Sequence, residues 1–374
     1  MSVQISSPAR ASAPAASPSV IPADRRRGRG AQSNATGRFE SHIRQEADDG
    51  WGSLEVLEAF ATEVREERAR SIIATNKSPD IGFDRSINPY RGCEHGCVYC
   101  YARPTHAYLG YSPGLDFETK LLAKVNAAEA LERELAAPGY RPETMALGTN
   151  TDPYQPIERN YRITRSVLET LARCNHPVGI VTKSALILRD LDLLAPMAAK
   201  GLVKVAVSIT TLDRRLARVM EPRASTPQKR LDAIQMLSAA GIPTAVMVAP
   251  VVPGLTDPEI ETILARAKAA GAMEAGYVLL RLPLEIADLF REWLEENFPD
   301  RARKVMSLVR STRGGKDYRA EWSERMRGTG PYAWQIGRRF EMASRRLGLD
   351  RKSLVLRADL FTPPVLAGQQ LRLL

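Results

Sequence analysis

Short apolar segments alternate with helical patterns between residues 86 and 286, and this alternation limits the possible folds more than any other feature of the sequence. The apolar segments have the length of buried strands and lie at 87–91, 144–148, 178–182, 203–209, 244–249 and 277–282. The helical patterns lie at 117–135, 164–174, 186–200, 226–240 and 258–270. Buried strands that alternate with helices predict a parallel sheet with right-handed crossovers.

The number of β/α units narrows the α/β architecture further. Six units are fewer than the eight of a closed barrel, so we expect a partial (β/α)6 barrel or an open, doubly wound sheet. In both arrangements, catalytic groups gather at the carboxyl ends of the strands. Site residues are therefore expected at those ends.

The overall composition is that of a globular protein. The 374 residues, 44% hydrophobic and 26% charged, can bury a sizeable core, and they exclude collagen-like, disulfide-scaffold and wholly disordered classes. No apolar run reaches the roughly 18–20 residues of a membrane span. The first residues form a Ser/Ala/Pro-rich tract and not a secretory signal. We expect a cytoplasmic protein without a membrane partner.

The segments that flank the β/α region differ from it. Residues 1–48 are rich in Ala, Ser and Pro, carry arginines at 25–29 and are predicted to be a disordered tail. Residues 49–85 are predicted to hold an amphipathic helix at 54–70 and a lead-in to the barrel at 86–286. Residues 287–374 are predicted to be a basic, mostly helical appendage. Within it, residues 301–374 contain 17 basic and 6 acidic residues, so this region is either a contact for nucleic acid or a solvated surface.

The most specific motif is a group of cysteines after the first predicted strand. Cys93, Cys97 and Cys100 are separated by three and then two residues, and three soft ligands so close together suit an iron–sulfur cluster or zinc. A three-cysteine cluster leaves one iron open, as a catalytic site requires. Zinc would need a fourth ligand, such as His95 or His106. Cys174, on a predicted helix, is expected to be a buried, inert thiol.

This motif resembles that of the radical S-adenosylmethionine (SAM) enzymes. Tyr99 stands just before the last cysteine, and the context at 87–93 and 99–103 is similar to that of the group related to spore photoproduct lyase, or DNA repair photolyase-like proteins. The resemblance implies that Cys93, Cys97 and Cys100 hold a [4Fe–4S] cluster. It also implies that SAM binds the open iron and is cleaved by one electron, from a donor such as flavodoxin or ferredoxin, to a 5′-deoxyadenosyl radical.

The polar residues at successive strand ends are the expected SAM contacts. After the second strand come Gly148, Thr149, Asn150 and Asp152, whose hydroxyl, amide and carboxylate groups suit a ligand ammonium. The position matches the family segment that meets the SAM amino group, although an ordinary β-to-α turn is the alternative.

Three further side chains complete the candidate site. Lys183 ends the third strand, where the resemblance implies a pair with the SAM carboxylate, and Ser208 lies near the end of the fourth, where a hydroxyl binds the ribose. Tyr99 is the candidate catalytic residue, as a hydrogen-atom relay, with packing around the cluster as the alternative. Arg281 ends the sixth strand and faces either an anionic group of a ligand or a structural acid.

One departure from the family pattern limits what the resemblance implies. Spore photoproduct lyase uses a cysteine near the end of the second strand as hydrogen-atom donor, and residues 145–155 contain none. This puts thymine-dimer reversal in doubt and leaves SAM cleavage intact. The alternative class is a non-catalytic iron–sulfur or zinc protein that binds nucleic acid through its basic region, which would not require polar residues at successive strand ends.

Overall fold

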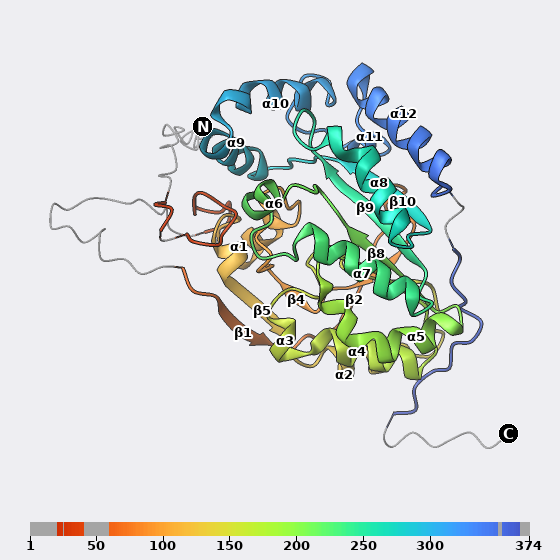
Figure 1. Cartoon of the computed structure of the whole chain (residues 1–374). Helices are drawn as coiled ribbons and strands as arrows, with labels where there is room; N and C mark the ends of the chain where they lie inside the picture. Colours follow the sequence, from red (N-terminus) through yellow and green to blue (C-terminus); the bar gives the residue numbers. More distant parts are fainter. Residues whose placement is uncertain (1–20, 25, 41–59, 351–353, 367–374) are drawn as a thin grey trace, which may run out of the picture.

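The computed structural model describes residues 21–24, 26–40, 60–350 and 354–366. Its main feature is a seven-stranded sheet in the order β10-β9-β8-β7-β6-β3-β2 (Figure 1). These strands are β2 (Ile73–Thr75), β3 (Arg85–Ile87), β6 (Met145–Leu147), β7 (Val178–Thr182), β8 (Val203–Ser208), β9 (Thr244–Val251) and β10 (Glu274–Leu279). The six from β3 to β10 run parallel, and only β2 is antiparallel to its neighbour.

The strand order decides between the two expected architectures. A doubly wound sheet reverses its strand order at a switch point. Here each new parallel strand adds to the same edge, and the sheet ends at β10 and β2 without closing. Successive right-handed crossovers in one direction place the helices on one face and curve the sheet around the other. The predicted partial (β/α)6 barrel is therefore confirmed.

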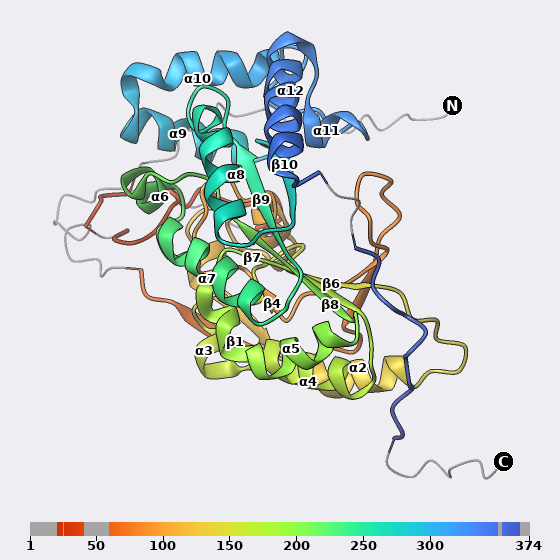
Figure 2. The ribbon, with the colours of Figure 1, turned by 45° about the vertical axis from the view of Figure 1, so that its right-hand side comes forward.

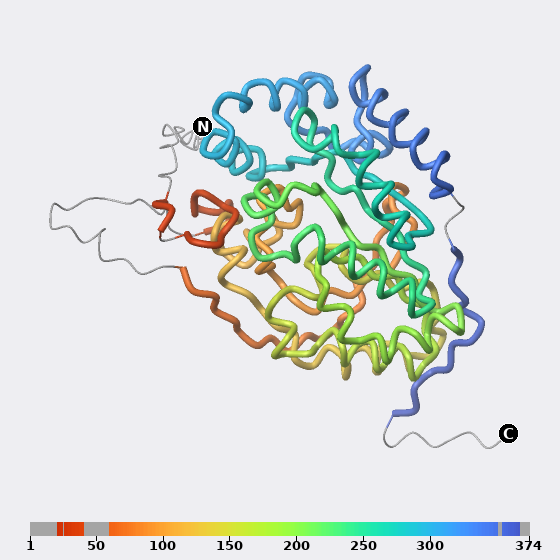
Figure 3. Tube along the Cα trace, viewed as in Figure 1, coloured from red at the N-terminus to blue at the C-terminus, as the bar shows by residue number. Residues whose placement is uncertain are grey.

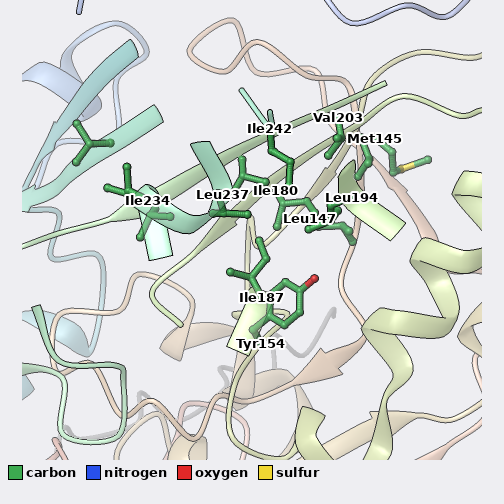
Figure 4. Close-up of a cluster of buried hydrophobic side chains, with 14 of the residues drawn as sticks. Met145, Leu147, Tyr154, Ile180, Ile187, Leu194, Val203, Ile234, Leu237 and Ile242 are labelled. Atoms are coloured by element: carbon green, nitrogen blue, oxygen red, sulfur yellow. The ribbon is translucent and has the colours of Figure 1, made fainter. Parts of the chain in front are cut away.

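The crossover helices match most of the helical patterns in the sequence. They are α2 (Ala127–Leu135), α4 (Ile163–Arg173), the 3₁₀ helix η3 (Ala185–Asp190) with α5 (Leu191–Ala199), α7 (Pro227–Ala239) and α8 (Ile260–Ala269). A shorter helix, α6 (Arg214–Met220), precedes α7. The apolar faces of these helices pack on the sheet. Figure 4 shows part of that core, which includes Met145, Ile180, Leu194 and Leu237.

Two of the helices predicted near the first cysteines are wrong. The described part of the helix expected over 54–70 contains strand β1 (Glu63–Glu67), and the helix expected over 117–135 is interrupted by strand β5 (Lys120–Lys124). Together with β4 (Tyr90–Arg91) they form a second sheet in the order β1-β5-β4. The expected first strand at 87–91 is correspondingly split between β3 and β4. Pairing between distant segments overrides the helical preference of these Glu-, Lys- and Leu-rich sequences.

The expected disordered tail is also different where the structure describes it. Residues 26–40 lie against the region around α1 (Asp116–Thr119), as the red segment of Figure 1 shows. Ala31 and Ser33 are fully buried. Residues 1–20 and 41–48 lie outside the described residues.

The C-terminal part is mostly helical and covers one end of the barrel. It contains α9 (Ile286–Asn297), α10 (Pro299–Ser311), α11 (Glu324–Arg327) and α12 (Gly330–Leu347), and α12 lies beside α8 (Figure 2). Phe340 of α12 packs on Tyr277 of β10, whereas Trp322 and Trp334 are 60% and 69% exposed.

The last described segment, residues 354–366, returns along the barrel to the amino ends of the strands (Figure 3). The Arg357 N–H donates to the carbonyl of Gly201 at 3.0 Å and the Thr362 N–H to that of Cys174 at 2.9 Å. No helix among the described residues is long and apolar enough to cross a membrane.

Candidate active site at the carboxyl ends of the strands

The three motif cysteines lie on one loop that follows β4. All are free thiols, and Cys93 and Cys97 are buried. Burial raises the pKa of Cys93, and the Asp152 carboxylate and the other two thiols raise it further, so the three sulfurs lie within electrostatic reach of one another. Burial likewise raises the pKa of Cys97 to about 12. Thiolates at such a site require a bound cation, which the irons of a cluster supply.

Among the described residues, the three motif thiols do not gather around a single point. Within the described part of the chain, no three His, Cys, Asp or Glu side chains gather as a single metal ion would require. In an iron–sulfur cluster each thiolate binds a different iron, so the three sulfurs need not surround one point. His106, a candidate zinc ligand, packs edge-on to Phe117, and both of its ring nitrogens lack a hydrogen-bond partner.

Arg103 binds the backbone of the cysteine loop. Its guanidinium donates to the carbonyls of Cys97 at 3.0 Å and Gly96 at 3.3 Å and forms an ion pair of 2.5 Å with Glu118. Both charged side chains are fully buried. Because the guanidinium has a fixed planar geometry, this pair fixes the loop backbone that carries the thiols.

The segment at 26–40 is hydrogen-bonded to the same carboxylate, that of Glu118. The N–H groups of Gly30 and Ala31 donate to Glu118 at 2.9 and 2.8 Å. Gly30 also lies so close to the loop that an added Cβ would stand 1.8 Å from the carbonyl oxygen of Gly96. This segment therefore covers the outside of the cysteine loop.

The polar segment after β6 is shaped by its neighbours. Gly148 has φ +84°, and an added Cβ would stand 1.9 Å from the carbonyl oxygen of Val181 in β7, so only glycine fits there. The carbonyl of Thr149 accepts a hydrogen bond from the hydroxyl of Tyr101, and the Asn150 N–H donates to Asn88 at 3.2 Å. These contacts fix the segment against the cysteine loop.

The carboxylate of Asp152 is hydrogen-bonded to other groups of the protein. Its carboxylate accepts from the Thr182 hydroxyl at 2.7 Å and from the Lys183 N–H at 2.8 Å, and His95 Nδ1 lies 3.4 Å away. Burial alone would raise the pKa of Asp152, but His95 and these hydrogen bonds lower it to about 2. Asp152 therefore links the end of β7 to the cysteine loop.

Lys183, Tyr99 and Ser208 meet at one buried network. The Lys183 ammonium lies 5.9 Å from the centre of the Tyr99 ring, and the Tyr99 hydroxyl donates to Glu221. Glu221 pairs with Arg230, which also donates to the carbonyl of Ser208 at 3.1 Å. Burial would raise the pKa of Glu221, but Arg230 and Lys183 lower it to about 2.

Glu221 and Arg230 were not expected from the sequence. Both are buried, at 3% and 1% exposure, and they join α6, α7 and the end of β8 to the cysteine loop. Neither falls at a strand end or in the cysteine motif, and only long-range packing brings them to the site. A charged residue on a helix ordinarily indicates a solvated face.

Arg281 follows β10 at the same end of the barrel and contacts the segment after the cysteine loop. Its guanidinium lies 5.0 Å from the centre of the ring of Tyr101, the residue after Cys100. It also approaches the hydroxyl of Tyr318 at 3.4 Å. The ends of the first and last β/α units thus meet above the sheet.

Fold and site together define an enzyme of the partial-barrel type with a three-cysteine loop at the carboxyl end of its sheet. Residues 87–267 match the model of the radical SAM superfamily. An uncharacterized protein of Mycobacterium tuberculosis is 42% identical over 242 residues, which cover 63% of this chain and 71% of that protein. A radical SAM Nα-GlyT isomerase of Pseudomonas phage M6 is 27% identical over 234 residues, or 61% of this chain and 46% of that protein.

A solved structure shows the same fold. Spore photoproduct lyase complexed with dinucleoside spore photoproduct superposes with a TM-score of 0.53 over 76% of this chain and 78% of that one, at 15% identity. The chain belongs to the radical SAM superfamily, and it is a radical SAM enzyme. This membership favours the enzyme over the non-catalytic binding protein.

Proposed function

We propose that this enzyme holds a [4Fe–4S] cluster through Cys93, Cys97 and Cys100, binds SAM beside it and acts on a nucleic acid. The observation that carries the proposal is the set of buried thiols on one loop at the carboxyl end of the sheet, in a radical SAM enzyme. When bound, such a cluster supplies the electron that cleaves SAM to a 5′-deoxyadenosyl radical. We expect a flavodoxin or ferredoxin as the one-electron donor.

The strand ends supply the contacts for SAM in this proposal. Asp152 fixes the backbone at Lys183, and Lys183 pairs its ammonium with the SAM carboxylate. Beside Gly148, the Thr149 hydroxyl and the Asn150 side-chain amide bind the SAM amino group, and Ser208 binds the ribose. Each contact comes from a different β/α loop, so SAM binds where the barrel has its greatest density of fixed polar groups.

Tyr99 has a separate role in the proposal. Its hydroxyl donates to Glu221, which Arg230 holds in place, so the phenol is kept at a defined position beside Lys183. We assign Tyr99 as the candidate hydrogen-atom relay, because it belongs to the cysteine loop and its ring lies 5.9 Å from the ammonium of Lys183, the proposed partner of the SAM carboxylate.

Two parts of the chain cover the cysteine loop. The segment at 26–40 covers one side of the cysteine loop. On the other side Trp293 of α9 is fully buried in the cluster of side chains that contains Cys97 and Val98. A radical intermediate needs such shielding from solvent.

Two observations support a nucleic-acid substrate. The solved structure of similar fold is a spore photoproduct lyase bound to a dinucleoside spore photoproduct. In addition, residues 301–374 carry an excess of basic groups.

The test is anaerobic reconstitution with iron and sulfide. We expect about four irons per chain, the broad visible absorption of an iron–sulfur cluster, and 5′-deoxyadenosine when dithionite and SAM are added. Reconstituted protein that holds iron and forms no 5′-deoxyadenosine would contradict the proposal.

A further inference from the structure

Arg281 is a cation without an acidic partner beside the cysteine loop. Its contacts are the Tyr101 ring, the Tyr318 hydroxyl and the sulfur of Met326 at 3.6 Å, and its buried Nε makes no hydrogen bond. No carboxylate of the described residues forms an ion pair with it. Asp80, whose pKa it helps to lower, is already bound to Arg325 and to the Ser323 N–H.

A second guanidinium stands behind it. Arg313 is 1% exposed, and it donates to the backbone carbonyls of Leu280 at 2.7 Å and Glu324 at 2.9 Å. Burial lowers the pKa of Arg313 to about 10, and the nearby charge of Arg281 contributes to the same shift. Arg313 is occupied by these carbonyls, so Arg281 is the guanidinium of this pair that can bind an anion at the barrel end.

A cavity that is widely open to solvent lies at Tyr318. It measures about 490 Å³ and is lined by Lys316, Tyr318, Arg319, Ala320, Glu321 and Trp322. Its volume is within the range of sites that bind small molecules, about 300–1,000 Å³. Its lining offers Lys316, the ion pair of Arg319 with Glu321 at 3.3 Å and an indole that is 60% exposed, so it suits a planar group next to an anionic one.

The basic surface of α12, in contrast, is largely neutralised. Arg338 pairs with Glu341 at 2.6 Å, Arg339 with Glu261 at 2.7 Å and Arg345 with Glu341 at 3.0 Å. The excess of basic residues in the appendage therefore does not itself locate a polyanion on this helix.

We propose that Arg281 binds a backbone phosphate of a single-stranded nucleic acid at the barrel end, and that the cavity at 316–322 holds the base of the neighbouring nucleotide. Trp322 supplies the stacking surface, and Lys316 binds the next phosphate. The contacts from Cys100 through Tyr101 and Arg281 to Tyr318 connect this cavity to the cysteine loop. A strand seated there passes across the radical-generating site. This inference rests on the proposed nucleic-acid substrate and assigns the surface that binds it.

The experiment measures binding of a fluorescein-labelled single-stranded DNA of mixed sequence, and of the same sequence as RNA, by fluorescence anisotropy. Arg281→Gln is expected to weaken binding at least tenfold and to reduce the slope of log affinity against log salt by about one. Trp322→Ala is expected to weaken binding about fivefold through lost stacking. Because Trp322 is on the surface, its replacement leaves the core intact.

Two matched controls come from α12. Trp334→Ala removes the other exposed tryptophan of the appendage, and Arg345→Gln removes an exposed, paired arginine; both should bind within twofold of wild type. Equal loss in the Trp322→Ala and Trp334→Ala variants would overturn the proposal. So would normal binding by Arg281→Gln.

Two further outcomes separate this inference from the proposed function. If the wild-type enzyme forms 5′-deoxyadenosine and binds neither oligonucleotide, the inference fails while the radical SAM function stands. If Arg281→Gln binds oligonucleotide normally but has lost affinity for SAM, Arg281 holds the SAM carboxylate and the inference fails. Absence of the cluster itself would contradict the proposed function whatever the oligonucleotide result.

Discussion

Arg103 and Glu118 form an ion pair of 2.5 Å from which water is excluded on every side. The guanidinium holds the carbonyls of the cysteine loop, and the carboxylate holds the backbone of the segment at 26–40. One buried pair thus joins the loop to its cover. Removal of one member leaves a buried charge without a partner, which is far more costly than the loss of a surface pair.

Glu118→Gln should lower the free energy of unfolding by about 3–5 kcal/mol, measured on the cluster-free protein by urea denaturation. The control is Glu129→Gln, which breaks an exposed pair with Arg68 and should change little. Similar effects of the two replacements would show that the buried pair has no special role.

Gly30→Ala should loosen the cover from the cysteine loop, because the new Cβ would stand 1.8 Å from the carbonyl oxygen of Gly96. We expect a loss of stability of about 1–3 kcal/mol and faster bleaching of the reconstituted cluster in air. Gly82→Ala is the control, since nothing lies within 4 Å of an added Cβ there. Equal bleaching rates would disprove the covering role of this segment.

Cys93→Ala should abolish the visible absorption of the cluster and the formation of 5′-deoxyadenosine, because one iron loses its protein ligand. Cys174→Ala should change neither property, since Cys174 is buried at the end of α4, at the opposite end of the strands. Retention of about four irons per chain in the Cys93→Ala protein would remove the cluster assignment.

Lys183→Ala should weaken SAM binding by about 1–3 kcal/mol, as the loss of a charge-assisted hydrogen bond predicts, with normal iron content. Lys200→Ala is the control, because that ammonium binds Asn175 at 2.7 Å on the other side of the barrel. Isothermal titration of both variants with SAM measures the difference. Unchanged affinity in Lys183→Ala would leave Lys183 without a role in SAM binding.

His176 predicts a dependence of stability on pH. Its Nε2 meets the Tyr140 hydroxyl at 2.8 Å, its ring packs on Phe361, and burial lowers its pKa from 6.5 to about 4. Between these values the unfolded chain binds the proton more tightly, so His176 alone should lower the free energy of unfolding by about 3 kcal/mol as the pH decreases from 6.5 to 4.

The comparison is with His176→Gln, in which this contribution is absent and the decline should be shallower. His106, also buried with a pKa lowered to about 4, titrates in both proteins and cancels in the difference. Parallel urea denaturation curves at several pH values measure both slopes. Identical slopes would show that His176 is not buried as a neutral ring.

The strands of the barrel could be predicted because the apolar runs in their sequences directly indicate buried segments. The predicted bounds of β7, Val178–Thr182, match the observed ones, and those predicted for β6, β8 and β9 differ from the observed bounds by one or two residues at an end. Each is a short apolar run between helices, which few other structures accommodate. β10 begins three residues earlier than expected, because its first residues are only half-buried.

The contacts that complete the site depend on segments far apart in the chain. Glu63–Glu67 and Lys120–Lys124 have helix-forming compositions and become strands only because they pair with each other. Residues 26–40 have no apolar period and are ordered by polar contacts with carboxylates far along the chain, among them Glu118, Asp116 and Glu292. The cysteine spacing indicated a cluster loop. No local sequence pattern identified the charged residues that hold this loop, which are Arg103, Glu118, Glu221 and Arg230.

The return of residues 354–366 to the amino ends of β7 and β8 also bears on how the enzyme is made. The carbonyls of Cys174 and Gly201 obtain their donors from Thr362 and Arg357. A ribosome that adds about 5–20 residues per second needs roughly 10–40 s to travel from the first of these carbonyls to its donor. Once β10 has been made, at residue 279, the barrel has all its parallel strands, while the ring of His176 still lacks its contact with Phe361. The segment 354–366 is therefore made after all the strands that it contacts, and it covers the amino end of the barrel, on the side opposite the cysteine loop.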